Sequence, residues 1–472
     1  MGLKKNILYS SFLTTSLYVF QFITYPYVAR VLGVTNIGIC NFAQSIVQYF
    51  MLFSMLGVSS LGIREIAACG NDRQQRNNVF SKIFQLTCLI TILVIVIYIV
   101  CIECIPKLTL YRNLLYVGIL QILFNTLTIE WLFRGLENFK YIAIRTLIIR
   151  IVYVIAIFTF VRCSNDYAIY FFILSATYVL NGITNLLYGR KFVYFKWQNI
   201  KCLYSYLTPL SYLGVQAILC AMYTSFNTVY LGFVTDDNQV GYYTTATKIQ
   251  GIILGLYSAF TLTMIPRMSI CKDKSERTRL LDNSMEVLLA FAIPIIIIAV
   301  FFSKEIIYII SGPEYEPASL MLMITMPLIL IIGIRQILVG QILIPNKADK
   351  STFTTSLTGG CLGFILNVLL VEHWKGLGSS IVFIGSEFMV LLSAYYFVRK
   401  HDLYKIKIQR IILHVILWIP FAITCLLLKH INNEYIKLMF SLISAMLLLH
   451  INMYYVLRNK SYIQLIKQIT HK

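Results

Sequence analysis

Runs of about twenty apolar residues recur along the whole chain, separated by short polar and basic segments. Each run is long enough to cross roughly 30 Å of hydrocarbon as an α-helix. The runs lack the alternating pattern of an outer-membrane β-strand, so helices must satisfy the backbone groups in lipid. Only 13% of the residues are charged, whereas a soluble domain has about 25%. The chain is therefore predicted to be an all-α polytopic membrane protein.

The apolar runs predict about fourteen transmembrane helices. Their expected bounds are 7–29, 37–59, 83–105, 113–133, 143–162, 167–188, 208–234, 240–264, 284–302, 318–344, 352–371, 377–398, 411–428 and 435–456. We group them into an N-terminal lobe of six helices (1–188), a cytoplasmic amphipathic connector (189–207) and a C-terminal lobe of six helices (208–398). Two extra helices and a basic cytoplasmic tail (399–472) complete the predicted domain organisation.

The net charge of +20 is distributed as membrane topology requires. With the N-terminus inside, 29 Lys and Arg residues fall in the predicted cytoplasmic segments and seven in the opposite loops. Short cytoplasmic loops of membrane proteins collect Lys and Arg in this way. We therefore expect both termini in the cytoplasm and no nucleic-acid partner. The basic and aromatic connector is expected to lie on membrane lipids.

A weak internal repeat appears at an offset of 203 residues. The segment Thr35–Gly38, followed by Ala43 and Ile46, aligns with Asn238–Gly241, followed by Ala246 and Ile249. Without a gap, the same register pairs Arg64 with Arg267 and Arg76 with Arg279. Both copies begin after a helix that leaves the cytoplasm. The repeat predicts two parallel lobes with a substrate cleft between them near the midplane.

Ionisable residues inside predicted spans are functional candidates, because burying a charge in the membrane is costly. Four basic positions stand out: Arg30 at the end of the first span, and Arg150, Lys248 and Arg335 inside later spans. For Arg30 and Arg150 the alternative is a side chain that extends to the membrane surface. Lys248 and Arg335 are predicted to lie deeper. Glu387 is expected to serve in helix packing or, less favourably, in ion binding.

Polar residues within the spans are candidates for sugar contacts or for hydrogen bonds between helices. We select Gln44, Gln48 and Asn227 as possible sugar contacts. The eleven cysteines have no zinc-site spacing, and no P-loop or Ser/His/Asp set is apparent. The sequence therefore predicts a transporter without a metal or cofactor rather than an enzyme.

Several stretches resemble Wzx-type polysaccharide flippases of the MOP superfamily, relatives of the MATE and MurJ transporters. They are TYPYVARVLGVTNIGICNFAQSIVQYF, LGIREIA, WLFRGLENFKYIAIR, VGYYTTATKI and IPR. The resemblance implies two six-helix lobes around a cationic cavity and alternating access. The implied activity is outward movement of undecaprenyl-diphosphate-linked repeat units of O-antigen or capsule across the bacterial inner membrane.

The resemblance also implies roles for single residues. Arg30 and Lys248 look like cavity-lining basic residues, and Arg64 and Arg267 look like gate or loop residues at the cytoplasmic end. Arg335 joins the expected diphosphate site on its depth alone. A polysaccharide polymerase and a chain-length regulator are the expected protein partners.

Two other functions have the same architecture. A MATE-like antiporter for drugs or metabolites would need an unpaired carboxylate in the cleft, whereas a basic interior attracts a diphosphate. A scaffold for a polysaccharide assembly complex would tolerate the loss of the cavity charges. The basic interior favours the flippase.

Overall fold

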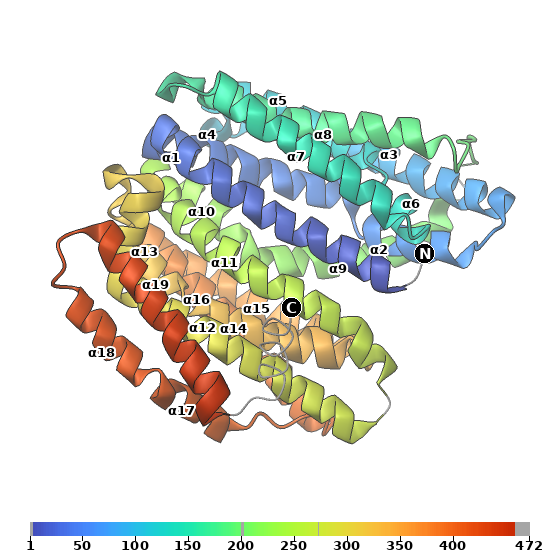
Figure 1. Ribbon diagram of the computed structural model, residues 1–472. Coiled ribbons are helices and arrows are strands. Elements are labelled where there is room, and N and C mark those ends of the chain that lie inside the picture. The colour runs from blue at the N-terminus through green and yellow to red at the C-terminus, as the bar shows by residue number, and fades with distance from the viewer. Residues whose placement is uncertain (1–2, 200–202, 272, 458–472) are drawn as a thin grey trace. The chain divides into compact units, whose positions relative to one another are not determined.

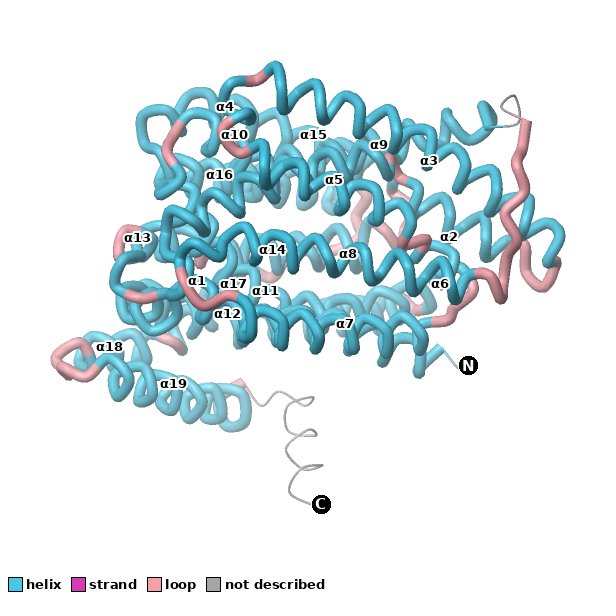
Figure 2. The backbone as a smooth tube through the Cα atoms, turned by 90° about the horizontal axis from the view of Figure 1, so that it is seen from above, coloured by secondary structure: helices cyan, strands magenta, loops and turns pink. Residues whose placement is uncertain are grey.

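The computed structural model describes residues 3–199, 203–271 and 273–457, all of them in helices or connecting loops (Figures 1 and 2). The chain forms two compact units, each described below by itself. The first consists of residues 1–244 and 363–379, and the second of residues 245–362 and 380–472. Lys201, Lys272 and the predicted basic tail, with Arg458, Lys460, Lys467 and Lys472, lie outside the described residues.

The first unit is a bundle of antiparallel helices (Figure 1). Its elements are α1 (Leu3–Met55), α2 (Val58–Ala68), α3 (Arg73–Cys104), α4 (Pro106–Thr109), α5 (Arg112–Leu127), α6 (Glu130–Gly135), α7 (Phe139–Phe160), η1 (Ser164–Asp166), α8 (Tyr167–Gly189), α9 (Tyr204–Thr224), α10 (Phe226–Val234), the start of α11 (Asp237–Ile270), η5 (Asn367–Val371) and the start of α16 (Glu372–Lys400). We call the end of this unit that carries Arg73, Arg134, Lys140 and Lys191 the basic end. The short helix α4 and the loops at 161–163 and 235–236 form the opposite end.

The second unit is built around the long helix α12. Its elements are the rest of α11 and α16, α12 (Lys274–Ser311), η3 (Pro313–Tyr315), α13 (Ala318–Thr325), α14 (Leu328–Arg335), the π-helix η4 (Gln336–Leu343), α15 (Asp349–Leu366), α17 (Ile408–Leu417), α18 (Ile419–Leu428), α19 (Glu434–Ile451) and η6 (Asn452–Val456). Lys437 on α19 pairs with Glu305 on α12 at 2.7 Å, and Arg410 on α17 pairs with Glu286. These ion pairs fasten the C-terminal helices to α12.

Eleven helical segments of the described chain are long and apolar enough to cross a membrane, or twelve if the bent pair α9–α10 is one span. Two of the breaks inside these segments affect the number of spans. Gly33 interrupts α1 with a φ of 75°, and Lys375 interrupts α16 with a φ of 50°. Both breaks lie between runs that the sequence separates, 7–29 from 37–59 and 352–371 from 377–398. The helical membrane fold is confirmed, whereas the count of fourteen stays a prediction.

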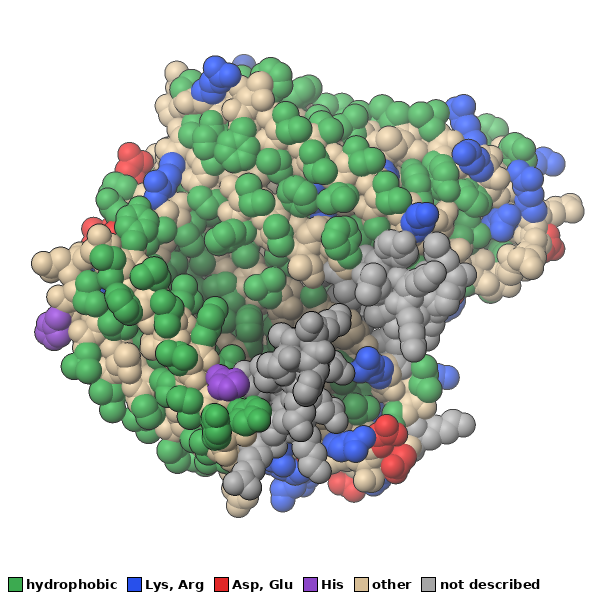
Figure 3. Space-filling view, viewed as in Figure 1, with side chains coloured by type: hydrophobic (Ala, Val, Ile, Leu, Met, Phe, Trp, Pro, Cys, Tyr) green, Lys and Arg blue, Asp and Glu red, His purple; other side chains and the backbone are tan. Residues whose placement is uncertain are grey.

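The surface of the first unit has the composition of a membrane protein. Hydrophobic side chains cover the length of α7 and α8, and most Lys and Arg side chains lie toward the helix ends (Figure 3). Exposed residues such as Ile148, Val152 and Ile155 on α7 form an apolar stripe. In a membrane protein such a stripe contacts lipid, which avoids the free-energy cost of apolar surface in water.

The core at the basic end packs around Trp131, which is only 3% exposed. Phe80 on α3 stacks on its ring at a centroid distance of 5.6 Å. Gly62 on α2 faces the same ring, and a Cβ there would lie 2.5 Å from Trp131 Cε3. Only glycine at position 62 allows α2 to approach α6 this closely.

Candidate functional site

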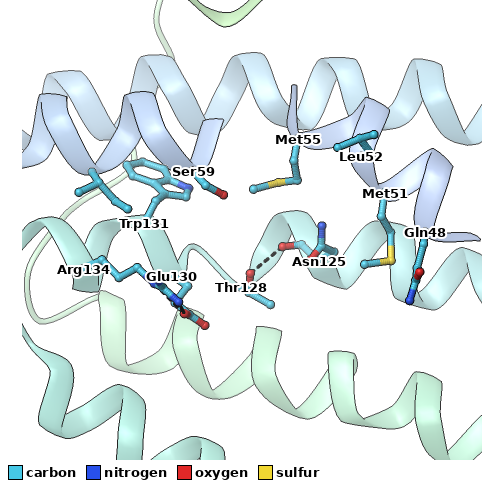
Figure 4. A pocket seen from close by; sticks show the side chains of 11 residues that line it. Gln48, Met51, Leu52, Met55, Ser59, Asn125, Thr128, Glu130, Trp131 and Arg134 are labelled. Carbon is cyan, nitrogen blue, oxygen red and sulfur yellow. Dashed lines mark hydrogen bonds and ion pairs between the residues drawn. The ribbon is translucent and has the colours of Figure 1, made fainter. Parts of the chain in front are cut away.

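A cavity of about 490 Å³ opens in the half of the first unit nearer the basic end. Its volume lies within the range of small-molecule sites. Its lining comes from α1, α2, α5 and α6 and the turns between them (Figure 4). The lining residues are Gln48, Met51, Leu52, Met55, Ser59, Ile63, Asn125, Thr128, Glu130, Trp131 and Arg134.

Two breaks in the helices shape this cavity. Leu56 and Gly57 separate α1 from α2 with φ values of 23° and 79°, and Ile129 separates α5 from α6 with a φ of 38°. Left-handed conformations are unfavourable for Leu and Ile, so tertiary packing must hold them. Ile129 is 1% exposed, which is consistent with such packing. The two breaks lie at the level of the cavity and redirect the chain around it.

The cavity wall combines apolar and hydrogen-bonding groups. Met51 and Met55 lie opposite Asn125 and Thr128 (Figure 4). The Thr128 hydroxyl donates to the backbone carbonyl of Asn125 at 2.7 Å, and Asn125 is part of the cavity lining. Gln48 contributes a second amide. Sites for small polar molecules have this mixture of apolar surface and a few placed polar groups.

A carboxylate between two arginines forms the charged edge of the site. Glu130 Oε1 lies 2.7 Å from the guanidinium of Arg134, and Glu130 Oε2 lies 3.3 Å from that of Arg145. The Arg134 side chain is 50% exposed, whereas that of Arg145 is 6% exposed. Two guanidinium groups and one carboxylate leave a net charge of about +1 beside the cavity, which favours anionic ligands.

Arg145 is a buried residue that was not selected from the sequence as a site residue. The structure buries it on α7, where it donates to Asn185 and, at 2.9 Å, to the Thr146 hydroxyl. It also lies over the Tyr141 ring at 5.8 Å. Its place within the apolar run IAIRTLI was the available signal, together with Glu130 as a possible partner.

At the opposite end of the first unit, α1 crosses the start of α11 at two glycines. A Cβ on Gly38 would lie 1.8 Å from the Asp237 carbonyl oxygen, and one on Gly241 would lie 2.4 Å from that of Val34. The Thr35 hydroxyl donates to Asn238 Oδ1 at 2.7 Å. The two helices are therefore in backbone contact.

Further polar contacts surround this crossing. Asn41 donates to the Thr244 hydroxyl at 2.8 Å. The Tyr111 hydroxyl donates to Asp237 at 2.7 Å, and Lys107 donates to the Thr235 carbonyl at 3.1 Å. These contacts close the end of the first unit that lies away from the cavity.

The second unit holds a buried ion pair. Arg335 Nε on α14 lies 2.8 Å from Glu387 Oε2 on α16. The Glu387 side chain is 1% exposed and that of Arg335 is 20% exposed. Glu387 therefore neutralises the charge of Arg335, one of the three basic residues expected to hold the diphosphate. Arg335 also ends α14 where the helix widens into the π-helix η4, a distortion often found at functional sites.

Residues 3–272 match the sequence profile of a family described as "Polysaccharide biosynthesis protein". The chain belongs to this family. A putative O-antigen transporter of Escherichia coli K12 is 24% identical over 413 residues, 85% of this chain and 98% of the relative. A probable low-salt glycan biosynthesis flippase of Haloferax volcanii is 24% identical over 188 residues, 39% of each chain.

Two solved structures show the fold of this polysaccharide biosynthesis protein. The lipid II flippase MurJ in an inward closed conformation has a TM-score of 0.80 at 14% identity, covering 96% of this chain and 100% of the other. An inward-facing multidrug resistance MATE transporter of the MOP superfamily has a TM-score of 0.59 at 12% identity, covering 82% and 94%. The predicted resemblance to Wzx, MurJ and MATE proteins is confirmed.

The other predicted site residues of this family member occupy different surroundings. Arg30 is exposed in the first unit, and Lys248 is half-buried on α11 in the second. Arg64 and Arg267, the predicted gate residues, are both exposed, and Arg64 lies 3.2 Å from Glu65. Their roles in binding and gating stay predictions.

The three predicted sugar contacts also differ. Gln48 lines the cavity, as a sugar contact would. Gln44 exchanges hydrogen bonds with buried Gln121 at 2.9 and 3.0 Å. Asn227 is fully buried, accepts from Asn367 at 2.7 Å and donates to Tyr243 at 3.4 Å. These contacts are typical of interhelical packing, the alternative that the sequence left open.

Proposed function

We propose that this chain is a flippase that moves a polyprenyl-diphosphate-linked oligosaccharide from the cytoplasmic to the periplasmic leaflet of the bacterial inner membrane. The observation that carries this proposal is the cavity of the first unit. It offers two amides, a carboxylate–arginine cluster and an apolar wall to a polar ligand. Sugars present hydroxyls and apolar ring faces to such surfaces. The named O-antigen and glycan relatives support the same substrate class.

The arrangement of the first unit supports alternating access. Its cavity lies toward the basic end, which the distribution of Lys and Arg assigns to the cytoplasm. The Gly38–Gly241 crossing closes the other end. A headgroup entering from the cytoplasm would occupy the cavity, and separation of the crossing would release it to the periplasm.

The diphosphate is assigned to Arg30 and Lys248, one from each repeat. Arg335 has a secondary role in this assignment because it forms an ion pair with Glu387. Moving about two negative charges outward across roughly 100 mV, inside negative, is favourable by about 4–5 kcal/mol. The membrane potential would therefore give direction, and the protein would lower the barrier.

Fourteen spans with both termini cytoplasmic form part of this proposal. The two segments broken at Gly33 and Lys375 are 54 and 52 residues long, enough for two crossings each. Counting each as two spans takes the twelve candidates to fourteen. The lobes 1–188 and 208–398, the connector 189–207 and a polymerase with its chain-length regulator as partners complete the proposal.

Deletion of the gene tests the class of transporter. The flippase proposal expects loss of surface polysaccharide and accumulation of the lipid-linked repeat unit on the cytoplasmic side. Normal polysaccharide with reduced dye efflux would instead identify a MATE-like antiporter.

Complementation of the deletion strain tests the residues. Lys248→Ala should abolish export at normal protein abundance, and Lys248→Arg should restore part of it because charge matters more than shape. Arg150→Ala is the matched control, since Arg150 donates to the Leu13 carbonyl at 2.9 Å and to Ser16 in helix packing. Wild-type export by both Lys248→Ala and Arg30→Ala would contradict the diphosphate assignment and would favour a scaffold.

A further inference from the structure

An extended segment that follows α8 lies along the beginning of α3. We call residues 193–198 the strap. The backbone N–H groups of Tyr194, Lys196 and Gln198 donate to side chains of α3 at 2.9, 3.0 and 2.9 Å. Their acceptors are Asn77, Ser81 and Gln85, in that order.

We call these three hydrogen bonds the ladder. It forms because the residue spacing along the strap matches the residue spacing along α3. Asn77, Ser81 and Gln85 are four residues apart on one face of a helix, a rise of about 6.0 Å per step. The strap donates from every second residue, and an extended chain advances about 6.6 Å over two residues. The steps agree closely enough for three successive bonds. The ladder therefore fixes the strap on α3 without a neighbouring β-strand.

Because the strap backbone is bonded to α3, its aromatic side chains are held outward. Trp197 is 76% exposed, Tyr194 61% and Phe195 41%. Phe195 contacts Phe84 of α3 at a centroid distance of 5.7 Å and Trp197 at 5.2 Å. Three exposed aromatic residues within four positions of the chain indicate a surface that contacts something other than bulk water.

Basic side chains frame these aromatic rings. Arg190, Lys191 and Lys196 are exposed on the same stretch of chain, and the Arg73 guanidinium lies 4.9 Å from the Tyr194 ring centre. Asp72, which precedes Arg73 in the chain, is engaged as the N-cap of α3, where it accepts from the backbone N–H groups of Gln74 and Gln75. The surface is therefore cationic and aromatic together.

The position of the strap on α3 indicates how deep the strap lies in the membrane. Beyond Gln85, the same side of the helix continues as an exposed apolar stripe that includes Leu89, Ile92, Val96 and Val100. That stripe faces hydrocarbon. The strap lies directly before it, at the level where aromatic residues concentrate in membrane proteins and where lipid headgroups begin.

We propose that the strap and its flanking basic residues bind anionic phospholipid headgroups of the cytoplasmic leaflet. Tyr194, Phe195 and Trp197 would enter the interfacial zone, while Lys191, Lys196 and Arg73 bind lipid phosphates. Basic aromatic surfaces bind anionic bilayers through insertion of the aromatic rings and through attraction between basic side chains and lipid phosphates. This site lies outside the cavity and does not depend on the proposed transport activity.

Fluorescence quenching by brominated lipid tests the proposal on the full-length protein. The protein is reconstituted in phosphatidylcholine nanodiscs with increasing mole fractions of brominated phosphatidylglycerol. The Trp197 signal is obtained as the difference between wild type and Trp197→Phe, since Trp131 and Trp418 are buried. We expect strong quenching of Trp197 and half-maximal quenching at a low mole fraction of the anionic lipid.

Two further variants separate charge from general lipid exposure. Lys191→Gln and Lys196→Gln should each raise the mole fraction at half-maximal quenching by roughly fivefold, because one basic residue is removed near the surface. Trp374, which is 55% exposed and adjacent in sequence to Lys375 at the opposite end, is the control. Its Trp374→Phe difference signal should show no preference for phosphatidylglycerol over brominated phosphatidylcholine.

The proposal is overturned if brominated phosphatidylcholine quenches Trp197 as effectively as brominated phosphatidylglycerol at equal mole fraction. It is also overturned if neither lipid quenches Trp197. Quenching by a single-stranded oligonucleotide in place of lipid would assign the surface to nucleic acid. Ser81→Ala and Gln85→Ala together, which remove two steps of the ladder, should weaken the preference while leaving Lys191 and Lys196 in the chain.

Discussion

Asn41 donates a hydrogen bond over 2.8 Å to Thr244, the residue that lies 203 positions later in the chain. Thr35 and Asn238, bonded over 2.7 Å, have the same separation. This number is the offset of the internal repeat that the sequence predicts. Both bonds therefore join residues that the predicted repeat makes equivalent.

The first prediction concerns Gly38 at the crossing of α1 and α11. Gly38→Ala should lower the free energy of unfolding by about 1–3 kcal/mol, because its Cβ would clash with the Asp237 carbonyl at 1.8 Å. Thermal unfolding in detergent measures the effect. Gly251→Ala is the control, since no atom lies within 4 Å of its Cβ position on α11. Equal melting temperatures for both variants would contradict the close contact.

A crosslink tests whether the crossing must open during transport. In a cysteine-free background, a short bifunctional thiol reagent should join Thr35→Cys to Asn238→Cys and stop export. Asn36→Cys with Asn238→Cys is the matched control, because the Asn36 amide donates to the Leu32 and Ser164 carbonyls at 3.1 and 2.8 Å, away from Asn238. Full export by a crosslinked Thr35→Cys/Asn238→Cys protein would show that this end need not open.

Some features of the structure could be predicted from the sequence, among them the repeat at an offset of 203 residues. The predicted repeat pairs Gly38 with Gly241, and the close backbone contact requires glycine at both positions. The apolar runs predicted the helical fold because hydrocarbon thickness sets their length. The breaks at Leu56 and Ile129 gave no such signal, since tertiary packing forces branched residues into left-handed conformations there. The cavity that these breaks shape was therefore not predicted.

The pairing of the buried charges in the second unit was not predicted from the sequence either. Arg335 and Glu387 were both recognised as charges within spans, but the distance between them depends on how α14 packs against α16. Removing either side chain should cost about 3–5 kcal/mol, because it leaves a buried charge unpaired. Arg335→Leu/Glu387→Leu should recover most of that stability, as measured by thermal unfolding.

Export by the same variants separates packing from substrate binding. If the pair serves packing, the double variant should transport at near wild-type rate. A stable double variant that transports nothing would assign Arg335 to the substrate. Glu387→Gln alone should be less stable than the double variant, and a single variant with wild-type stability would contradict a structural role for the pair.

The two arginines beside the cavity should differ in their contribution to stability. Arg145→Ala should destabilise the protein by about 3 kcal/mol or more, because Arg145 is buried against Glu130 and Asn185. Arg134→Ala should cost at most about 1 kcal/mol, since half of its side chain is exposed. Denaturation of both variants in the same detergent makes the comparison. Equal losses would contradict the distinction between a structural and a cavity-facing arginine.

The central claim is tested most directly with purified protein in liposomes that contain a fluorescent polyprenyl-diphosphate oligosaccharide. A membrane-impermeant quencher reports how fast the lipid moves between leaflets. The account predicts rapid translocation by wild type, strong slowing by Gln48→Leu/Asn125→Leu in the cavity, and near-normal translocation by Arg150→Ala. Wild-type protein that leaves the lipid in its original leaflet, or a cavity variant that moves it at the wild-type rate, would contradict the account.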